Sequence, residues 1–223
     1  SDDLPNAFND RNRATILDMI SKFPQFKKMF KFIWMSYGSS SDLLYKFEGK
    51  IRAILKSSNG VKQGDPLALF LFALSVQPAF QLANTVPGVT AVAIADDIEI
   101  IGEPEKAFKA LDIYQKKLDE LGVNQKSPKK FVLWPHNSAP PTYLVRECEK
   151  RKIRLSAGGQ TEEGEWIGGF EVILGVPVSL NVTAIREWLS EKIKGHSTFF
   201  QNLLNPHLST KNALIMLRNV GVS

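Results

Sequence analysis

The sequence predicts an α+β fold, in which a mixed region of strands and helices is followed by a mostly helical end. Up to about residue 180, apolar residues recur both at alternate positions and at intervals of three or four, which indicates strands interleaved with helices. Beyond residue 180 the helical interval alone remains. The two patterns predict one domain at residues 1–180 and a second at residues 181–223.

The composition is that of an ordinary globular protein, with 43% hydrophobic and 23% charged residues in a chain of 223. A chain of this length buries a core without disulfide bonds. Because Cys148 is its one cysteine, an internal disulfide is excluded. We expect Cys148 to be a small, half-buried hydrophobic residue. The formal charge of +5 is compatible with a nucleic-acid partner, although many basic proteins bind no nucleic acid.

The sequence contains no pattern that predicts a membrane partner or a secretory leader. Polar residues interrupt its longest apolar run, 66–83, so we expect a buried helix there and not a membrane span. The chain starts with Ser1-Asp2-Asp3, which lacks the basic and apolar regions of a signal peptide. We therefore expect an intracellular protein, and the missing initial Met predicts a fragment of a longer one.

Two helices and a hairpin are expected in the first quarter of the chain. Asn9 and Asp10 are good N-cap types, and apolar residues at helical spacing follow them to about Lys22. After Pro24 a second amphipathic pattern begins. The expected elements are a helix to about 22, a second helix that 37–40 ends, and a hairpin with strands at 43–47 and 51–56.

A loop and a capped helix are expected next. The loop is 59–65, and Asp65 is a natural N-cap with Pro66 at the first helical position. Pro78 should kink this helix, because proline removes an internal hydrogen bond.

The rest of the chain alternates between strands and helices before it becomes helical. The expected elements are strands on both sides of Asp96-Asp97, a helix from 103 that Gly122 closes, a strand at 131–134, an irregular region at 135–169, a strand pair at 170–178, and helices from 183 onward.

The acidic pair Asp96-Asp97 is the strongest candidate for chemistry. Adjacent carboxylates are usually solvated surface charge, but here both flanks are apolar. Two charges in such a setting are costly without a compensating cation, and a divalent metal is one way to compensate them. The pair alone leaves metal binding and plain surface charge equally open.

Two further segments gain meaning from their place in the chain. In the loop before the predicted helix, Lys62, Gln63 and Gly64 offer a cation, a two-sided hydrogen bonder and room for close approach, although a plain capped helix start is the alternative. Asp3, followed by Phe8, is weak alone, since acidic residues at a chain end are usually disordered.

Together these segments resemble the reverse transcriptases of non-LTR (LINE-like) retrotransposons. The resemblance covers five motifs in the family's order: Asp3-Leu4-Pro5-Asn6-Ala7-Phe8, Gly60 to Ala68, Ala95-Asp96-Asp97, Leu121-Gly122-Val123 with Ser127-Pro128-Lys129-Lys130, and Ile173-Leu174-Gly175-Val176-Pro177-Val178. It implies a polymerase palm with an RRM/ferredoxin-like core at residues 1–180, and a partial helical thumb at 181–223.

The resemblance also implies a two-metal nucleotidyl transfer with Mg²⁺, or alternatively Mn²⁺. Asp3 and Asp96 would be the main metal ligands, Asp97 would support them, and the backbone carbonyl of Leu4 would be an extra ligand. Lys130, or its neighbour Lys129, would protonate the leaving pyrophosphate, although adjacent lysines are more often plain surface.

Other residues would bind the nucleotide and the primer. Phe8 would be a steric gate against the 2′-hydroxyl, with a core aromatic as the alternative role. Gln63 and Gly64 would lie along the template strand or the incoming base pair. The primer grip would be Leu174-Gly175-Val176.

The implied partners are an RNA template, a DNA primer, deoxynucleotide triphosphates, and the fingers and endonuclease regions of the parent protein, in the nucleus or a cytoplasmic ribonucleoprotein. Three departures from the family pattern matter. Ile94 stands where the family usually has Tyr, Pro5 stands where Lys is common, and no fingers region precedes Asp3. We therefore expect the isolated chain to be weak or inactive.

Two alternatives stay open at this point. A domesticated or decayed relative would keep the fold for a structural or nucleic-acid-binding role. A viral RNA-dependent RNA polymerase shares the palm, but Gln63-Gly64-Asp65-Pro66 argues against it.

Overall fold

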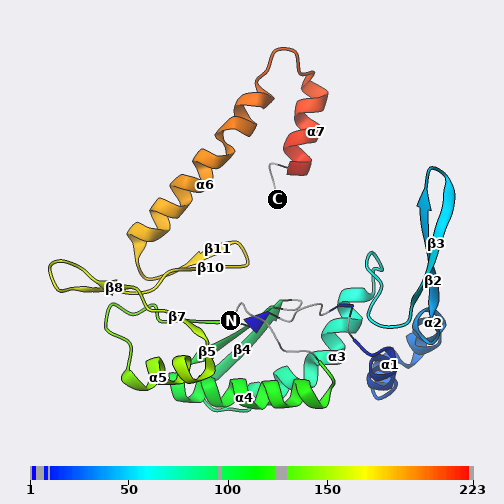
Figure 1. Ribbon diagram of the computed structural model, residues 1–223, viewed down its shortest axis with the longest axis horizontal. Helices are drawn as coiled ribbons and strands as arrows, with labels where there is room; N and C mark the ends of the chain where they lie inside the picture. Colours follow the sequence, from blue (N-terminus) through cyan, green and yellow to red (C-terminus); the bar gives the residue numbers. More distant parts are fainter. Residues whose placement is uncertain (1, 4–7, 10, 95–96, 124–129, 221–223) are drawn as a thin grey trace. The chain divides into compact units, whose positions relative to one another are not determined.

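The computed structural model describes residues 2–3, 8–9, 11–94, 97–123 and 130–220, with the backbone alone at 2–3 and 217–220 (Figure 1). The chain forms two compact units, Ser1–Phe131 and Val132–Ser223. Small antiparallel sheets alternate with helices, so the predicted α+β class is confirmed. The predicted domain boundary near residue 180 stays a prediction.

A three-stranded antiparallel sheet lies at the centre of the first unit. Its strand order is β1-β5-β4, where β1 is Asp2–Asp3, β4 is Val89–Ile94 and β5 is Asp97–Gly102. Two helices contact this sheet and each other, α3 (Ala68–Ala83) and α4 (Pro104–Glu120) (Figure 1). The two predicted strands and the helix after them are therefore confirmed, and the residues between the strands, 95–96, lie outside the described residues.

Apolar side chains from both helices and from the preceding ones form the core of this unit. The largest fully buried apolar and aromatic members are Ile16, Ile20, Ile33, Tyr37, Leu71, Phe72, Ile98, Tyr114 and Leu118. They come from α1 (Arg13–Ser21), α2 (Lys27–Tyr37), α3, β5 and α4. Ile98 thus ties β5 into a core that the helices of this unit share.

The first helix begins later than predicted. Asn12, and neither Asn9 nor Asp10, is its N-cap, because the Asn12 side chain accepts a 2.8 Å hydrogen bond from the backbone N–H of Ala14. The second helix is confirmed, with a short 3₁₀ turn, η1 (Pro24–Phe26), ahead of it.

The predicted hairpin is confirmed as β2 (Ser41–Phe47) and β3 (Lys50–Ser57). Its turn, Glu48-Gly49, has positive φ at both positions, as a type I′ turn requires. Apolar cross-strand pairs lie on both faces, such as Leu43 opposite Leu55 and Leu44 opposite Ile54, and all four side chains are exposed.

The helix after the 59–65 loop starts at Ala68, two residues beyond the predicted first position. Asp65 still stabilises this start, since its Oδ1 accepts a 2.9 Å hydrogen bond from the backbone N–H of Leu67. The helix continues through Pro78 to Ala83. At the end of α4, Gly122 has a φ of +67°, which suits the predicted helix stop.

The second unit contains short strand pairs and three helices within the described residues. Its elements are β6 (Phe131–Leu133), α5 (Thr142–Arg151), β7 (Arg154–Ser156), β8 (Gly159–Gln160), β9 (Trp166–Ile167), β10 (Glu171–Ile173), β11 (Val176–Val178), α6 (Val182–Leu203) and α7 (Thr210–Val220). The strand at 131, the strand pair at 170–178 and the helical end are confirmed.

The helix α5 corrects the prediction that 135–169 is irregular. Leu144 and Cys148, one helical turn apart, are buried, while most of the other side chains of this helix are exposed. Cys148 is more deeply buried than predicted, and burial raises the pKa of its thiol. Within the ranges described above, no helix has the length and apolar character needed to cross a membrane.

Candidate functional site

The first strand pairs with the second strand of the central hairpin at the predicted acidic positions. β1 runs antiparallel to β5, with Asp2 opposite Ile98 and Asp3 opposite Asp97. On the other side of β5, Asp97 lies opposite Ile94 of β4. The backbone of the first predicted motif is therefore brought beside the third, although most of the first unit separates them in sequence.

The strand that carries Asp97 is held by the core. Ile98, the next residue, has 1% of its side chain exposed and lies opposite Ala93 of β4. Asp97 itself is half-buried. The carboxylate is thus fixed on a strand that has little freedom to move, which suits a ligand that must keep its place.

The metal ligands other than Asp97 are only partly described. Leu4 and Asp96 lie outside the described residues, and the side chain of Asp3 does too. Among the side chains that the structure does describe, no three His, Cys, Asp or Glu residues form a metal-binding group. The predicted set of Asp3, Leu4, Asp96 and Asp97 stays a prediction.

Phe8 packs inward, against the helix that follows the second motif. Its ring stacks on Phe72 of α3 with 4.7 Å between the ring centroids, and it is half-buried. Its backbone carbonyl accepts a 2.7 Å hydrogen bond from the N–H of Val61. Phe8 therefore connects the first motif to the second, and its role as a steric gate stays a prediction.

Gly60 lies where the two segments meet. Its N–H donates a 2.7 Å hydrogen bond to the carbonyl of Arg11, and its φ is +71°. A Cβ at this position would lie 2.5 Å from the carbonyl oxygens of Phe8 and Asn9. Only glycine fits such an approach, so the first and second motifs are locked together backbone to backbone.

Gln63 and Gly64 form the exposed tip of the loop. The N–H of Asp65 donates a 3.1 Å hydrogen bond to the carbonyl of Lys62, which closes a β-turn around the two residues. Gly64 has a φ of +83°, and no atom lies within 4 Å of where its Cβ would be. The turn therefore presents an open backbone surface, as close approach of a ligand requires.

Two buried arginines at the start of α1 support this region. Arg13 donates to the carbonyls of Ser57, Asn59 and Gly60. Arg11 donates from Nε to the hydroxyl of Ser75, and burial lowers its pKa. Each guanidinium group thus links the start of α1 to a segment distant in sequence, α3 for Arg11 and the end of β3 with its following loop for Arg13.

Tyr37, at the end of α2, contacts the loop from the other side. Its hydroxyl donates a short hydrogen bond to Oδ2 of Asp65 and accepts one of 3.2 Å from the N–H of Lys62. Burial, and then the bond to Asp65, raise the pKa of Tyr37 to about 12.

The sequence analysis missed Arg11, Arg13 and Tyr37. Their signal is faint, because an arginine at a helix start and a tyrosine at a helix end are usually surface residues. Their positions, shortly after the first motif and directly before Gly38, do not reveal the distant carbonyls and carboxylate that they bind.

Lys130 is half-buried directly before β6, and Lys129 lies outside the described residues. The predicted primer grip belongs to the second unit. There Leu174 and Gly175 have φ values of +51° and +79° and form the two-residue turn between β10 and β11. Leu174 and Val176 expose their side chains. The roles of the two lysines and of the three primer-grip residues stay predictions.

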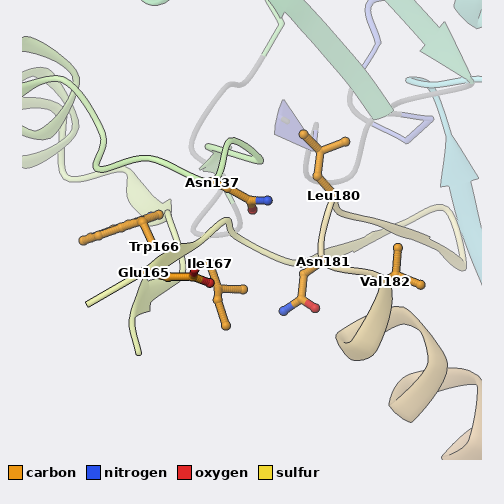
Figure 2. A pocket seen from close by; sticks show the side chains of 7 residues that line it. All are labelled: Asn137, Glu165, Trp166, Ile167, Leu180, Asn181 and Val182. Atoms are coloured by element: carbon orange, nitrogen blue, oxygen red, sulfur yellow. The ribbon is translucent and has the colours of Figure 1, made fainter. Parts of the chain in front are cut away.

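The second unit also contains a shallow pocket of about 500 Å³, which no prediction included (Figure 2). Asn137, Glu165 and Trp166 line it, together with Ile167, Leu180, Asn181 and Val182. Three of its polar side chains have structural tasks: Asn181 caps α6, the indole N–H of Trp166 donates to the carbonyl of Ala157, and Oδ1 of Asn137 accepts a hydrogen bond from the N–H of Gly168.

Comparisons with known proteins give one informative similarity. No protein-family model matches the chain. Over 129 residues, 57% of this chain, it is 23% identical to the 132 kDa protein of the retrotransposable element SLACS from Trypanosoma brucei gambiense. The matched stretch spans 11% of that protein's length. The similarity supports a retroelement-related origin for the chain.

Proposed function

We propose that the chain is the palm and part of the thumb of a reverse transcriptase, and that its parent protein catalyses RNA-templated DNA synthesis. The observation that carries this proposal is the pairing of β1 with β5, in which Asp3 lies opposite Asp97. Residues of the predicted first and third polymerase motifs thus share one sheet.

The donor set fits a hard divalent cation. Residues directly opposite one another in an antiparallel pair have Cα atoms about 4.5–5.5 Å apart, so two acidic positions from distant segments are neighbours here. Carboxylate and carbonyl oxygens are the ligands that Mg²⁺ and Mn²⁺ prefer. Bound metal would stabilise the attacking and the leaving oxygens of the transfer.

The remaining predicted residues would place the substrates around the acids. The exposed turn Gln63-Gly64 would contact the template or the incoming nucleotide, and Phe8 would limit the space beside it. Lys130 would donate a proton to the leaving pyrophosphate, and Leu174-Gly175-Val176 would hold the primer end. The partners proposed are an RNA template, a DNA primer and deoxynucleotide triphosphates, with the parent's fingers and endonuclease regions.

Primer extension by the parent protein tests the proposal. The parent protein with Mg²⁺ should extend a DNA primer on an RNA template. Asp97→Asn and Asp96→Asn should reduce extension to the level of a reaction without enzyme. Glu105→Gln, the same kind of change on an exposed side chain of α4, should leave extension unchanged. A wild-type parent protein that does not extend the primer would refute the enzyme, and full activity in Asp97→Asn would refute the metal assignment.

Metal binding by the chain itself is a second test. Isothermal titration with Mn²⁺ should show weak binding that Asp3→Asn reduces and Glu105→Gln does not. Equal binding by the wild type and Asp3→Asn would remove Asp3 from the ligand set.

A further inference from the structure

The loop that carries Gln63 and Gly64 is attached to the helices before it at several points. Arg13 has 5% of its surface exposed and donates five hydrogen bonds, all to uncharged oxygens. The acceptors are the carbonyls of Ser39, Ser57, Asn59 and Gly60 and the hydroxyl of Ser57. A planar guanidinium with five donors fixes the direction of each of these carbonyls. Arg13 therefore fixes the backbone of the loop where it follows β3.

Tyr37 holds the other end of the same loop. Its hydroxyl binds the N–H of Lys62 and the carboxylate of Asp65, which are the first and last residues of the turn around Gln63-Gly64. The other oxygen of that carboxylate accepts the N–H of Leu67, just before α3. One hydroxyl thus joins both ends of the turn to the first residues of the helix.

The tyrosine is well suited to a fixed role. It has 1% of its surface exposed, and the cations of Arg13 and Lys62 each lie 5.5 Å from the centre of its ring. Its hydroxyl is protonated at neutral pH and donates to Asp65, and the rise of its pKa to about 12 extends this protonated range to more alkaline pH. The support is buried, whereas Gln63 and Gly64 at the tip are exposed.

We infer that Tyr37, with Arg13 behind it, is a positioning residue that fixes the exposed Gln63-Gly64 turn for substrate contact. The inference rests on the proposed function for what the turn contacts, and on the hydrogen bonds of Tyr37 and Asp65 for how the turn is held. Tyr37 touches no substrate and acts through Lys62 and Asp65. Removal of its hydroxyl should free the turn without unfolding the core that surrounds the ring.

Amide hydrogen exchange on the full chain tests the attachment without any activity. In Tyr37→Phe, exchange of the Lys62 and Asp65 amides should accelerate about 10-fold, as the loss of one buried hydrogen bond predicts. Amides in the middle of α3 should keep their rates. Tyr45→Phe, the same change at an exposed position of β2, should alter neither set. Unchanged exchange at Lys62 and Asp65, or equal acceleration throughout the first unit, would overturn the inference.

Steady-state kinetics of the parent protein test the positioning. Tyr37→Phe should raise KM for the deoxynucleotide triphosphate several-fold with kcat and Tm nearly unchanged, while Tyr45→Phe should match the wild type. Faster exchange together with unchanged KM would overturn the positioning role and leave the proposed function intact. A wild-type parent protein without extension activity would refute the proposed function, and the substrate role of the turn with it.

Discussion

The first unit contains two β-hairpins of opposite character. β4–β5 has six-residue strands, pairs with β1, and contacts α3 and α4. β2–β3 has longer strands, of seven and eight residues, and yet no side chain of either strand is buried. Strand length and regular pairing therefore do not decide which hairpin becomes rigid. Cover by helices does, and Asp97 lies on the covered hairpin.

The difference has a physical origin in where apolar side chains can go. An isolated two-stranded hairpin is at best marginally stable in water, because it has no second layer against which to bury a face. In β4–β5 the helices supply that layer. In β2–β3 the cross-strand pairs hold most of the form, and Arg13 holds only its base, at Ser57. A site that needs fixed carboxylates is thus expected on β4–β5.

The largest effect should come from alanine at two glycines with the same backbone conformation. Gly60 and Gly49 have φ values of +71° and +73°, but a Cβ at Gly60 meets backbone atoms at 2.5 Å and one at Gly49 meets nothing within 4 Å. Gly60→Ala should cost about 4 kcal/mol and Gly49→Ala about 1 kcal/mol. Urea unfolding of both variants measures the difference. Equal costs would show that the first and second motifs are not locked as described.

A second test makes one substitution on each hairpin. Ile98 is 1% exposed on β5 and Ile54 is 59% exposed on β3. Ile98→Ala should lower the free energy of unfolding by about 3 kcal/mol, and Ile54→Ala by about 0.5 kcal/mol or less. Denaturant unfolding measures both values. A large loss at Ile54 would mean that the outer hairpin is covered in solution, and the comparison above would then fail.

The third effect depends on pH and concerns the support of the loop. The pKa of Tyr37 is raised to about 12 in the folded chain from 10.0 for a free tyrosine. Its contribution to stability is thus fully present below pH 10 and is lost as the pH rises through 12. The free energy of unfolding should fall over this range in the wild type and fall less in Tyr37→Phe. Identical alkaline profiles would contradict the assigned burial.

The smallest effect is expected at the open hairpin. Lys56 and Asp42 form an ion pair across β2 and β3, and both side chains are largely exposed. Asp42→Asn should change the free energy of unfolding by about 0.5 kcal/mol or less, since solvent screens such pairs. The change should shrink further in high salt, which thermal unfolding at two salt concentrations measures. A larger, salt-independent loss would indicate that the pair is shielded from solvent.

Local patterns in the sequence were enough to predict most of the elements, because their signals are short-range. Glu48-Gly49 between two apolar runs predicts a hairpin, and Gly122 after a helical pattern predicts a stop. Helix α5 was missed because only Leu144 and Cys148 are buried, too few for a visible stripe. The start of α1 was misplaced because Asn9, Asp10 and Asn12 are all cap types.

For the candidate site, the residues could be predicted from the sequence, but the contacts between distant segments could not. The identity of Asp3, Asp97 and the Gln63-Gly64 turn came from the sequence and a family resemblance. The register that sets Asp3 opposite Asp97 did not, since pairing between distant strands depends on the whole fold. The hydrogen bond between Tyr37 and Asp65 could not be predicted either, because it requires the end of one helix to meet a loop 28 residues later.

The contact at Gly60 has a consequence for how such a chain can diverge. The bonds from Gly60 and Val61 reach carbonyl oxygens of Arg11 and Phe8, and every residue type supplies a carbonyl. The backbone hydrogen bonds therefore do not depend on the side chains at positions 8 and 11, which have contacts of their own with α3, whereas position 60 has no room for an added carbon. Any chimera of this region should exchange residues 8–11 and 60–61 together, because the backbone of each segment must fit the other.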